Sequence, residues 1–316
     1  MEKPHKTAIF AKFFQKAMPK VSIIIPVYNT EQYLEQTLQC LCQQTLPDIE
    51  ILVTDDGSTD NSADIVRRMQ QHDERIHYFY QNNQGQSAAR NKALRQATGD
   101  YIYFMDSDDL IGTDALRQCY EYAETTQADF IFFDGDVKRE EGAQELPWNY
   151  KRTHLFEERK PYRGEELLRR VLNERKHSCV VWLLFIRRSY LERIKLLFHE
   201  GIIHEDELFT TKLTLQSNRV YCLKKCFVTH RVRPASTMGT RFSRYNVDCY
   251  LTVIDELLRY HRSPIIHKFA RYTLTLVFYT AHLIPFRDKP AVFWRAVSSG
   301  YLKYISLKSI FVFWLK

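Results

Sequence analysis

Residues 101–109 read YIYFMDSDD, a short apolar run that passes directly into a cluster of carboxylates. Such a run predicts a buried β-strand. Two similar junctions lie upstream, where VSIIIPV at 21–27 precedes Tyr28-Asn29 and the apolar run 49–54 precedes Asp55-Asp56. Each of the three stretches therefore predicts a strand that ends at a polar cluster.

Helical spacing separates these strands. Predicted helices run from after Thr30 to Gln44, from Asp60 to Gln71 and from Gln86 to Ala97, and a further strand covers Ile76 to Tyr80. The alternation predicts βαβ units and a mainly parallel sheet flanked by helices on both faces. Ligands bind such sheets outside the carboxyl ends of the strands, which is where the three polar clusters fall. The sequence therefore predicts an active site at that edge.

The rest of the chain gives weaker signals. It predicts strands at Phe130–Asp134 and Val180–Ile186, helices at Leu167–Leu172 and Leu208–Leu215, and no clear periodicity at Gly135–Lys160. The composition turns basic and helical near Arg241. The predicted organisation is an N-terminal extension at 1–20, a catalytic domain at 21–240 and a basic amphipathic helical region at 241–316.

The charge is unevenly distributed. Residues 241–316 hold 12 Lys and Arg against 4 Asp and Glu, whereas the remainder holds 33 against 34. No apolar run approaches the ~20 residues of a membrane span. Peripheral contact with an anionic membrane is one interpretation. Ordinary core-facing helices with solvated charges are the other, and the lack of a recognition module argues against nucleic acid.

Composition sets the class of protein. With 316 residues, 45% hydrophobic and 26% charged, the chain predicts one or two folded domains. Seven cysteines without a regular framework indicate reduced thiols rather than disulfides or zinc. The first twenty residues lack the pattern of a secretory signal. A cytoplasmic protein, peripheral at the inner face of the cell membrane, is expected, and self-association is compatible with the sequence.

The carboxylates at 106–109 predict a metal site. Close carboxylates repel one another unless a cation is present, and Mn²⁺ or Mg²⁺ binds one or two of them together with phosphate oxygens. The alternative is an acidic turn that caps a helix beginning near Thr113. Arg90 offers a guanidinium that could pair with a diphosphate or brace the acidic cluster, with a surface salt bridge as the alternative. Asp55 either belongs to a turn or accepts a hydrogen bond from a nucleotide base.

The motifs together are more specific than each alone. SIIIPVYNTEQYLEQTLQCLCQQT, ILVTDDGSTDNS, NQGQSAARNKAL and TGDYIYFMDSDD occur in this order within about the first 135 residues. The chain thereby resembles the family 2 glycosyltransferases, which have the GT-A fold, and in particular bacterial members that assemble polysaccharides. The likeness resumes at GIIHEDELF, residues 201–209, and at HRVRPAS, residues 230–236.

The resemblance implies a metal-dependent, inverting transfer of a hexose or N-acetylhexosamine from a UDP-sugar to an acceptor hydroxyl, on a lipid-linked or cell-surface glycan. It also implies roles for individual residues: Pro26, Val27, Tyr28, Asn29 and Glu31 line the nucleotide pocket; Asp55 contacts the uracil, with Ser58 nearby; Asp106 faces the ribose or donor sugar and, with Asp108, the metal; Asp206 is the general base, beside Glu205.

The chemistry of an inverting transfer requires such groups. The acceptor hydroxyl must lose its proton as it attacks, which a carboxylate can accept. Arg231 or Arg233 would stabilise the leaving diphosphate together with the metal. His230 is either a structural residue or a phosphate donor or metal neighbour, and residues 204–206 could equally be the acidic first turn of a helix.

Two other classes compete with the transferase. A metal-dependent sugar nucleotidyltransferase also needs strand-end carboxylates, but the chain lacks its Gly-rich phosphate loop. A non-catalytic sugar-nucleotide or membrane-binding scaffold would have a broken metal or base motif, and both motifs are intact. Neither G-x-G-x-x-G nor G-x-x-x-x-G-K-[ST] follows the first strand, which argues against dinucleotide and P-loop binding.

Overall fold

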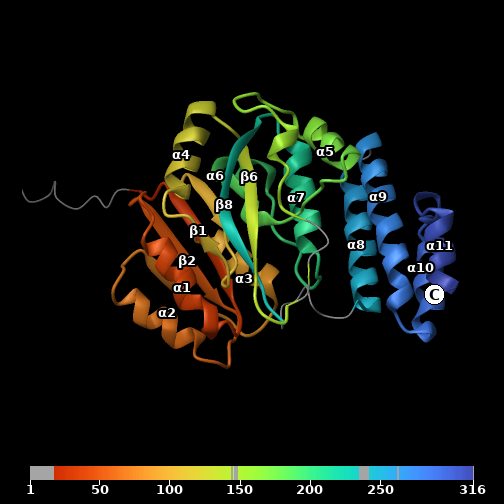
Figure 1. The fold of residues 1–316 in the computed structure, drawn as a ribbon, viewed down its shortest axis with the longest axis horizontal. Helices are drawn as coiled ribbons and strands as arrows, with labels where there is room; N and C mark the ends of the chain where they lie inside the picture. The colour runs from red at the N-terminus through yellow and green to blue at the C-terminus, as the bar shows by residue number, and fades with distance from the viewer. Residues whose placement is uncertain (1–17, 144, 146–148, 235–241, 262, 316) are drawn as a thin grey trace, which may run out of the picture.

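A single mixed sheet organises the chain in the computed structural model, which describes residues 18–143, 145, 149–234, 242–261 and 263–315 (Figure 1). Within those ranges the sheet has eight strands in the order β3-β2-β1-β4-β7-β6-β8-β5. Their bounds are β1 Val21–Val27, β2 Ile49–Asp55, β3 Ile76–Tyr80, β4 Tyr101–Phe104, β5 Leu110–Ile111, β6 Phe130–Arg139, β7 Leu184–Arg187 and β8 Val220–Val232.

The directions of the strands determine which strand ends share an edge of the sheet. β3, β2, β1 and β4 are parallel neighbours, as the sequence predicted. β7 is antiparallel to both β4 and β6, and β6 is parallel to β8, so β6 and β8 run in the same direction as β1. The carboxyl ends of β1, β2, β4 and β8 therefore meet at one edge of the sheet.

Helices cover both faces of the sheet. Their bounds are α1 Glu31–Cys42, α2 Ser62–Gln70, α3 Gln86–Leu94, α4 Ala115–Thr126, α5 Gly164–Asn173, α6 Arg188–Ile194, α7 Glu205–Gln216, α8 Arg244–Tyr260, α9 Pro264–Thr280, α10 Lys289–Ser298 and α11 Leu307–Leu315. Single turns of 3₁₀ helix include η3 Val181–Leu183, η5 Ala281–Leu283 and η6 Phe286–Asp288.

The two faces of β1 belong to two hydrophobic clusters. Ile23 and Ile25 pack into the cluster that contains Leu38 of α1. Ile24, between them, packs into the cluster that contains Phe209 of α7. Alternate strand residues point to opposite faces. A run that is apolar at every position is therefore what a strand buried on both faces requires.

The C-terminal helices share the second of these clusters. Buried residues of α8, α9 and α11, such as Leu251, Phe269 and Phe313, pack in the same cluster as Phe132 of β6. Figure 1 shows α8 and α9 beside α7 and α5, with α10 and α11 farther out. The predicted boundary at 240/241 lies outside the described residues. Nowhere in the described ranges is a helix long and apolar enough to cross a bilayer.

Several boundaries differ from the sequence predictions. The predicted strand 180–186 is a 3₁₀ turn followed by β7, so only its second half is strand. β6 continues to Arg139, into a segment for which no periodicity was expected, because β8 pairs with it along its length. β8 and α6 were not predicted.

Gly164 at the start of α5 lies so close to α7 that a Cβ atom would come within 1.5 Å of the Thr214 carbonyl oxygen.

Candidate active site

A buried guanidinium joins three carboxylates at the carboxyl edge of the sheet. Arg90 of α3, 2% exposed, donates to Asp106 Oδ1 at 2.9 Å, to Glu205 Oε1 at 2.8 Å and to Asp206 Oδ1 at 3.1 Å. Asp106 follows β4, and the other two carboxylates begin α7. Arg90 thus braces the acidic cluster from inside the protein and is not part of a surface salt bridge. Residues 106 and 206 lie in one site.

Asp56 holds the start of α3 in place. Its carboxylate accepts hydrogen bonds from the backbone N–H groups of Gln84 at 2.9 Å and Gly85 at 2.8 Å. Gly85 has a φ of 89°, a value that favours glycine. The next residue, Gln86, donates its side-chain amide to Glu205 at 2.5 Å. The polar end of β2 therefore orients the helix that carries Arg90.

Two further carboxylates after β4 pair with the end of β8. Asp109, fully buried, lies 3.0 Å from His230 Nδ1 and accepts the Arg231 backbone N–H at 2.9 Å. Burial raises the pKa of Asp109 to about 6, although His230 opposes the shift. Asp108 accepts from Arg233 Nε at 2.8 Å. Burial, reinforced by the negative charge of Asp106, raises the pKa of Asp108.

The acidic cluster is therefore not the cap of the following helix. α4 begins at Ala115, two residues beyond the predicted start, and Asp114 precedes it. His230 stacks on Trp182, with ring centroids 5.4 Å apart. The burial of Asp109 and its pairing with His230 give that histidine a structural role in this edge.

Arg231 presents donors that nothing in the described structure accepts. Its side chain is 6% exposed, and Nε and Nη2 are buried without a hydrogen-bond partner among the described residues. The guanidinium lies over the ring of Tyr33, 5.4 Å from the centroid, and Arg233 lies over the same ring at the same distance. Unpaired buried donors are costly, so this position favours an anionic ligand.

The residues predicted to line a nucleotide pocket lie at the ends of β1 and β2. Pro26 and Val27 end β1, where Val27 is paired with Asp55. Tyr28 is 48% exposed, and Asn29 has a φ of 50°. Asn29 also links the loops, because its side-chain oxygen accepts the Thr59 N–H at 2.8 Å.

The two carboxylates predicted to contact the nucleotide, Asp55 and Glu31, already accept hydrogen bonds within the protein. Asp55 accepts the Ser58 N–H and the Tyr78 hydroxyl, each at 2.8 Å. Glu31 accepts from Asn61, through its backbone at 2.9 Å and its side chain at 2.7 Å. A carboxylate has about four acceptor positions, so Asp55 keeps capacity for a further donor.

Asp206, the candidate general base, follows a loop that contacts helix α8. His204, which precedes α7, has a φ of 65°, and its ring stacks on Tyr250 of α8 with centroids 3.9 Å apart. Asn246 lies 3.3 Å from His204 Nε2, and the Tyr245 hydroxyl donates to the Gly201 carbonyl at 3.0 Å. Helix α8 therefore fixes the loop that leads into Asp206.

The environment of Asp206 suits a proton acceptor. Its side chain is 20% exposed. Burial raises the pKa of Asp206 well above its ordinary value, and the positive charge of Arg90 opposes that shift. A carboxylate with a raised pKa holds a proton more strongly, which brings it closer to the neutral range that suits a general base.

The predicted metal ligands have protein partners in the structure. Among the described residues, no three His, Cys, Asp or Glu side chains are grouped as a metal site. Asp106 is paired with Arg90 and Asp108 with Arg233. The neighbouring charge that raises the pKa of Asp108 nevertheless marks a repelling pair, which a divalent cation would relieve.

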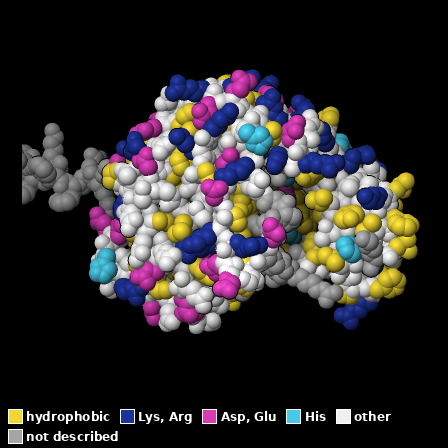
Figure 2. Space-filling view, in the orientation of Figure 1, with side chains coloured by type: hydrophobic (Ala, Val, Ile, Leu, Met, Phe, Trp, Pro, Cys, Tyr) yellow, Lys and Arg dark blue, Asp and Glu magenta, His cyan; other side chains and the backbone are white. Residues whose placement is uncertain are grey.

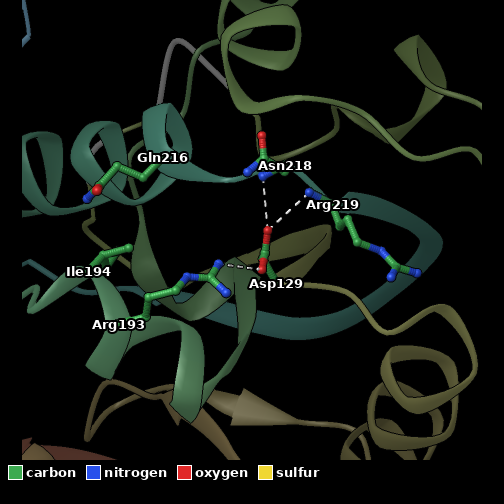
Figure 3. A pocket seen from close by; sticks show the side chains of 6 residues that line it. All are labelled: Asp129, Arg193, Ile194, Gln216, Asn218 and Arg219. Atoms are coloured by element: carbon green, nitrogen blue, oxygen red, sulfur yellow. Dashed lines mark hydrogen bonds and ion pairs between the residues drawn. The ribbon is translucent and has the colours of Figure 1, made fainter.

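A separate pocket lies at the opposite edge of the sheet, next to the amino end of β6 (Figure 3). It is lined by Asp129, Arg193, Ile194, Gln216, Asn218 and Arg219. Figure 3 shows the Asp129 carboxylate joined to Arg193 and to the backbone of Asn218 and Arg219. No residue predicted for the active site lines this pocket.

Comparison with known proteins decides the family. The model of glycosyl transferase family 2 matches residues 22–195, more than half of the 316 residues. The chain belongs to glycosyl transferase family 2. The chain is also similar to the uncharacterized glycosyltransferase EpsJ of Bacillus subtilis, to which it is 33% identical over 220 residues. That alignment covers 69% of this chain and 63% of EpsJ, so the chain spans less than two thirds of that relative.

Solved structures share the fold. Residues 1–349 of TarS from S. aureus, in complex with UDP-GlcNAc, match with a TM-score of 0.71 and 22% identity, covering 93% of this chain and 83% of that one. The mannosyltransferase PcManGT from Pyrobaculum calidifontis, in complex with GDP-Man and Mn²⁺, matches with a TM-score of 0.60 and 20% identity, covering 92% and 78%. These likenesses confirm the predicted GT-A architecture.

Much of the candidate site lies beyond the family 2 match. The match ends at residue 195, before Asp206, His230 and Arg231. Sequence reasoning found these residues from HEDELF and HRVRPAS, but not the pairing of His230 and Arg231 with Asp109 or the contact of His204 with Tyr250. The short buried run Val220 to Leu223 was the available signal for β8.

Proposed function

We propose that this chain is an inverting glycosyltransferase that moves a hexose or N-acetylhexosamine from a UDP-sugar to an acceptor hydroxyl. The observation that carries the proposal is the Arg90 cluster, in which the carboxylate after β4 and those that begin α7 contact one guanidinium. Donor-side and acceptor-side groups are thus within one small volume. Membership of family 2 favours glycosyl transfer over nucleotidyl transfer.

The donor would lie along the carboxyl ends of β1 and β2. Pro26 to Asn29 and Ser58 would line its nucleotide, and Asp55 would accept a hydrogen bond from the uracil. TarS, which shares this fold, was solved with UDP-GlcNAc, which supports a uridine nucleotide. Arg231 and Arg233 would hold the diphosphate, since Arg231 keeps buried N–H groups without a partner in the described structure.

Asp206 would act as the general base. It would take the proton of the acceptor hydroxyl while that oxygen attacks the anomeric carbon from the side opposite the diphosphate, which inverts the configuration. Glu205, 2% exposed in its side chain, would hold Arg90 and shape the acceptor side. Arg90 would keep Asp206 ionised until it accepts the proton.

A divalent cation fits the donor side. Asp108 and Asp106 would hold Mn²⁺ or Mg²⁺, because oxygen ligands suit hard cations and the two carboxylates repel each other in its absence. When bound, such an ion would supply positive charge to the departing diphosphate. Arg233 would then move from Asp108 to the phosphates. PcManGT was solved with Mn²⁺, which supports a metal in this fold.

The acceptor is proposed to be a lipid-linked or cell-surface glycan, reached from the cytoplasmic side of a membrane. The basic, apolar C-terminal helices support that location.

The test is a donor screen followed by product analysis. UDP-sugars with Mn²⁺ should raise the melting temperature, since a ligand that binds only the folded state stabilises it. Nuclear magnetic resonance of the product should show the anomeric configuration opposite to that of the donor. Retention of configuration would reject the mechanism, and stabilisation by non-uridine donors alone would reject the nucleotide.

A further inference from the structure

The last three helices carry the net charge of the whole protein. Residues 263–316 contain 8 of the 45 Lys and Arg and one of the 38 Asp and Glu, so the other 262 residues hold 37 of each. The one acidic residue, Asp288, lies 3.9 Å from Arg244 and is paired. Arg271, Arg287, Lys303 and Lys308 are exposed. The excess charge is thus localised and available to a partner.

The same helices expose the largest apolar side chains. Eight of the fifteen exposed large hydrophobic residues in the described chain lie between 263 and 315. They form what we call the C-terminal face: Leu276, Tyr279, Leu283, Phe286, Trp294, Leu307, Phe311 and Leu315. Figure 2 shows hydrophobic side chains gathered at the right-hand end of the molecule, where these helices lie, with a few basic side chains at its edge. Monomeric proteins rarely leave such a patch without a function.

The exposed residues are arranged on neighbouring elements. On α11, Leu307, Phe311 and Leu315 recur every four residues and so form one stripe, 85%, 65% and 66% exposed. Helix α11 packs on α9, where Ser309 donates to the Thr275 carbonyl at 2.8 Å. The ring of Trp314 lies 6.3 Å from that of Phe286. Helix α11 therefore lies beside η6, which carries the exposed Phe286.

We propose that the C-terminal face docks onto a bilayer containing anionic lipids. Aromatic side chains favour the membrane interface, exposed leucines and phenylalanines enter the acyl boundary, and lysines and arginines attract anionic headgroups. This inference gives the membrane location proposed above a defined surface, and its test makes no use of the transferase activity.

Charge distinguishes the bilayer from a second copy of the chain. In a twofold dimer the same surface meets itself, so Arg287, Lys303 and Lys308 would face like charges. Like charges across an interface oppose association, whereas an anionic bilayer is complementary to them.

The experiment measures binding of the full chain to vesicles. Phosphatidylcholine vesicles with phosphatidylglycerol should co-sediment the protein, vesicles of phosphatidylcholine alone should not, and added salt should weaken binding. Trp294, 71% exposed, should shift its fluorescence to shorter wavelength on binding, and Trp294→Phe should remove most of that shift.

Two sets of variants test the apolar and the basic contributions to vesicle binding separately. The triple variant Trp294→Ser, Leu307→Ser and Phe311→Ser should abolish binding, whereas Leu197→Ser with Val137→Ser, exposed elsewhere, should not. Lys303→Glu with Lys308→Glu should weaken binding by about 25-fold or more, at about fivefold for each lysine. Lys224→Glu with Lys225→Glu, on β8, is the matched control. Circular dichroism checks that each variant is folded.

Binding that needs both anionic lipid and the C-terminal face supports the proposal. A wild-type chain that ignores anionic vesicles overturns it, and so does a triple variant that binds as tightly as wild type. A dimer seen by sedimentation equilibrium, lost in the triple variant and unable to bind vesicles, overturns it in favour of a second copy. Binding by Asp206→Asn separates this outcome from that of the transferase proposal.

Discussion

Two carboxylates at opposite edges of the sheet, Asp129 and Asp206, have contrasting surroundings. Asp129 accepts hydrogen bonds from Arg193, from the Ser217 hydroxyl and from the backbone N–H groups of residues 218 and 219. Asp206 instead shares a single guanidinium, that of Arg90, with two other carboxylates. The acceptor positions of the Asp129 carboxylate are therefore occupied. Asp206, in contrast, lies in a cluster where the carboxylates outnumber the single guanidinium.

The difference separates a carboxylate that holds the fold from one that is available for chemistry. Asp129 precedes β6 and binds donors on α6 and on the loop before β8. Its hydrogen bonds therefore hold these elements together. Asp206 has part of its side chain exposed and a raised pKa, the combination expected of a general base. The pocket beside Asp129 is therefore a structural feature. The cluster around Arg90, whose carboxylates have fewer hydrogen-bond donors, is the candidate active site.

The largest effect is expected from Asp206→Asn. The amide cannot accept the proton of the acceptor, so kcat should fall by ~10²–10⁴-fold while UDP binding persists. Steady-state kinetics measures kcat, and calorimetric titration measures the binding of UDP. Because a buried carboxylate with a raised pKa is costly when ionised, the variant should unfold at the wild-type temperature or above it. Unchanged kcat would remove Asp206 from the role of base.

The pH dependence of kcat sharpens the contrast. The folded-state pKa of Asp206 is raised, so the active, ionised form is lost at a higher pH than an ordinary Asp pKa of about 3.9 would give. Below the shifted pKa, kcat should fall about tenfold per pH unit. The profile of wild type should thus show an acidic limb displaced upward, and the residual activity of Asp206→Asn should lack it. A limb at the ordinary value contradicts the assignment.

Asp129→Ala should have the opposite outcome to Asp206→Asn. It leaves two part-buried backbone N–H groups and the buried Ser217 hydroxyl without their acceptor, so the free energy of unfolding should fall by about 2–3 kcal/mol. Denaturation in urea measures this loss. At a temperature where the variant is folded, kcat should stay within about twofold of wild type. A large loss of kcat without a loss of stability would move the site to the other edge.

Sequence reasoning predicted this edge of the molecule better than the rest because its signals are local. Ile23 to Ile25 are apolar at every position, and the polar clusters follow directly. The roles of Asp129 and of β8 depend on partners more than fifty residues away along the chain. β8 also contains the exposed stretch 224–226, at which its pairing with β6 shifts register, so its hydrophobic pattern is interrupted.

The candidate site was predicted as a set of residues but not as a network. Arg90 was expected near the acidic cluster, and HEDELF supplied Asp206, yet only the fold brings residues 90, 106 and 206 together. The pairing of Asp109 with His230 spans 121 positions, and no spacing rule reaches that far. The positive φ of His204 was likewise not predicted, although histidine adopts such values more often than most residues other than glycine.

The smallest effect is expected at the contact that positions the base. Tyr250→Ala removes the ring on which His204 stacks and loosens the loop before Asp206, so kcat should fall by about tenfold with little change in the KM for donor. Tyr250→Phe keeps the ring and should restore kcat. Equal losses in the two variants would show that stacking does not position the base.

Crystals of Asp206→Asn grown with UDP and Mn²⁺ offer the most direct measurement. An anomalous difference map should place the ion at Asp108 and Asp106, with the diphosphate between it and Arg231 and with residue 206 facing the open side of that site. A nucleotide bound elsewhere, for example beside Arg193 and Arg219 at the opposite edge, would contradict a single site that contains both Asp108 and Asp206.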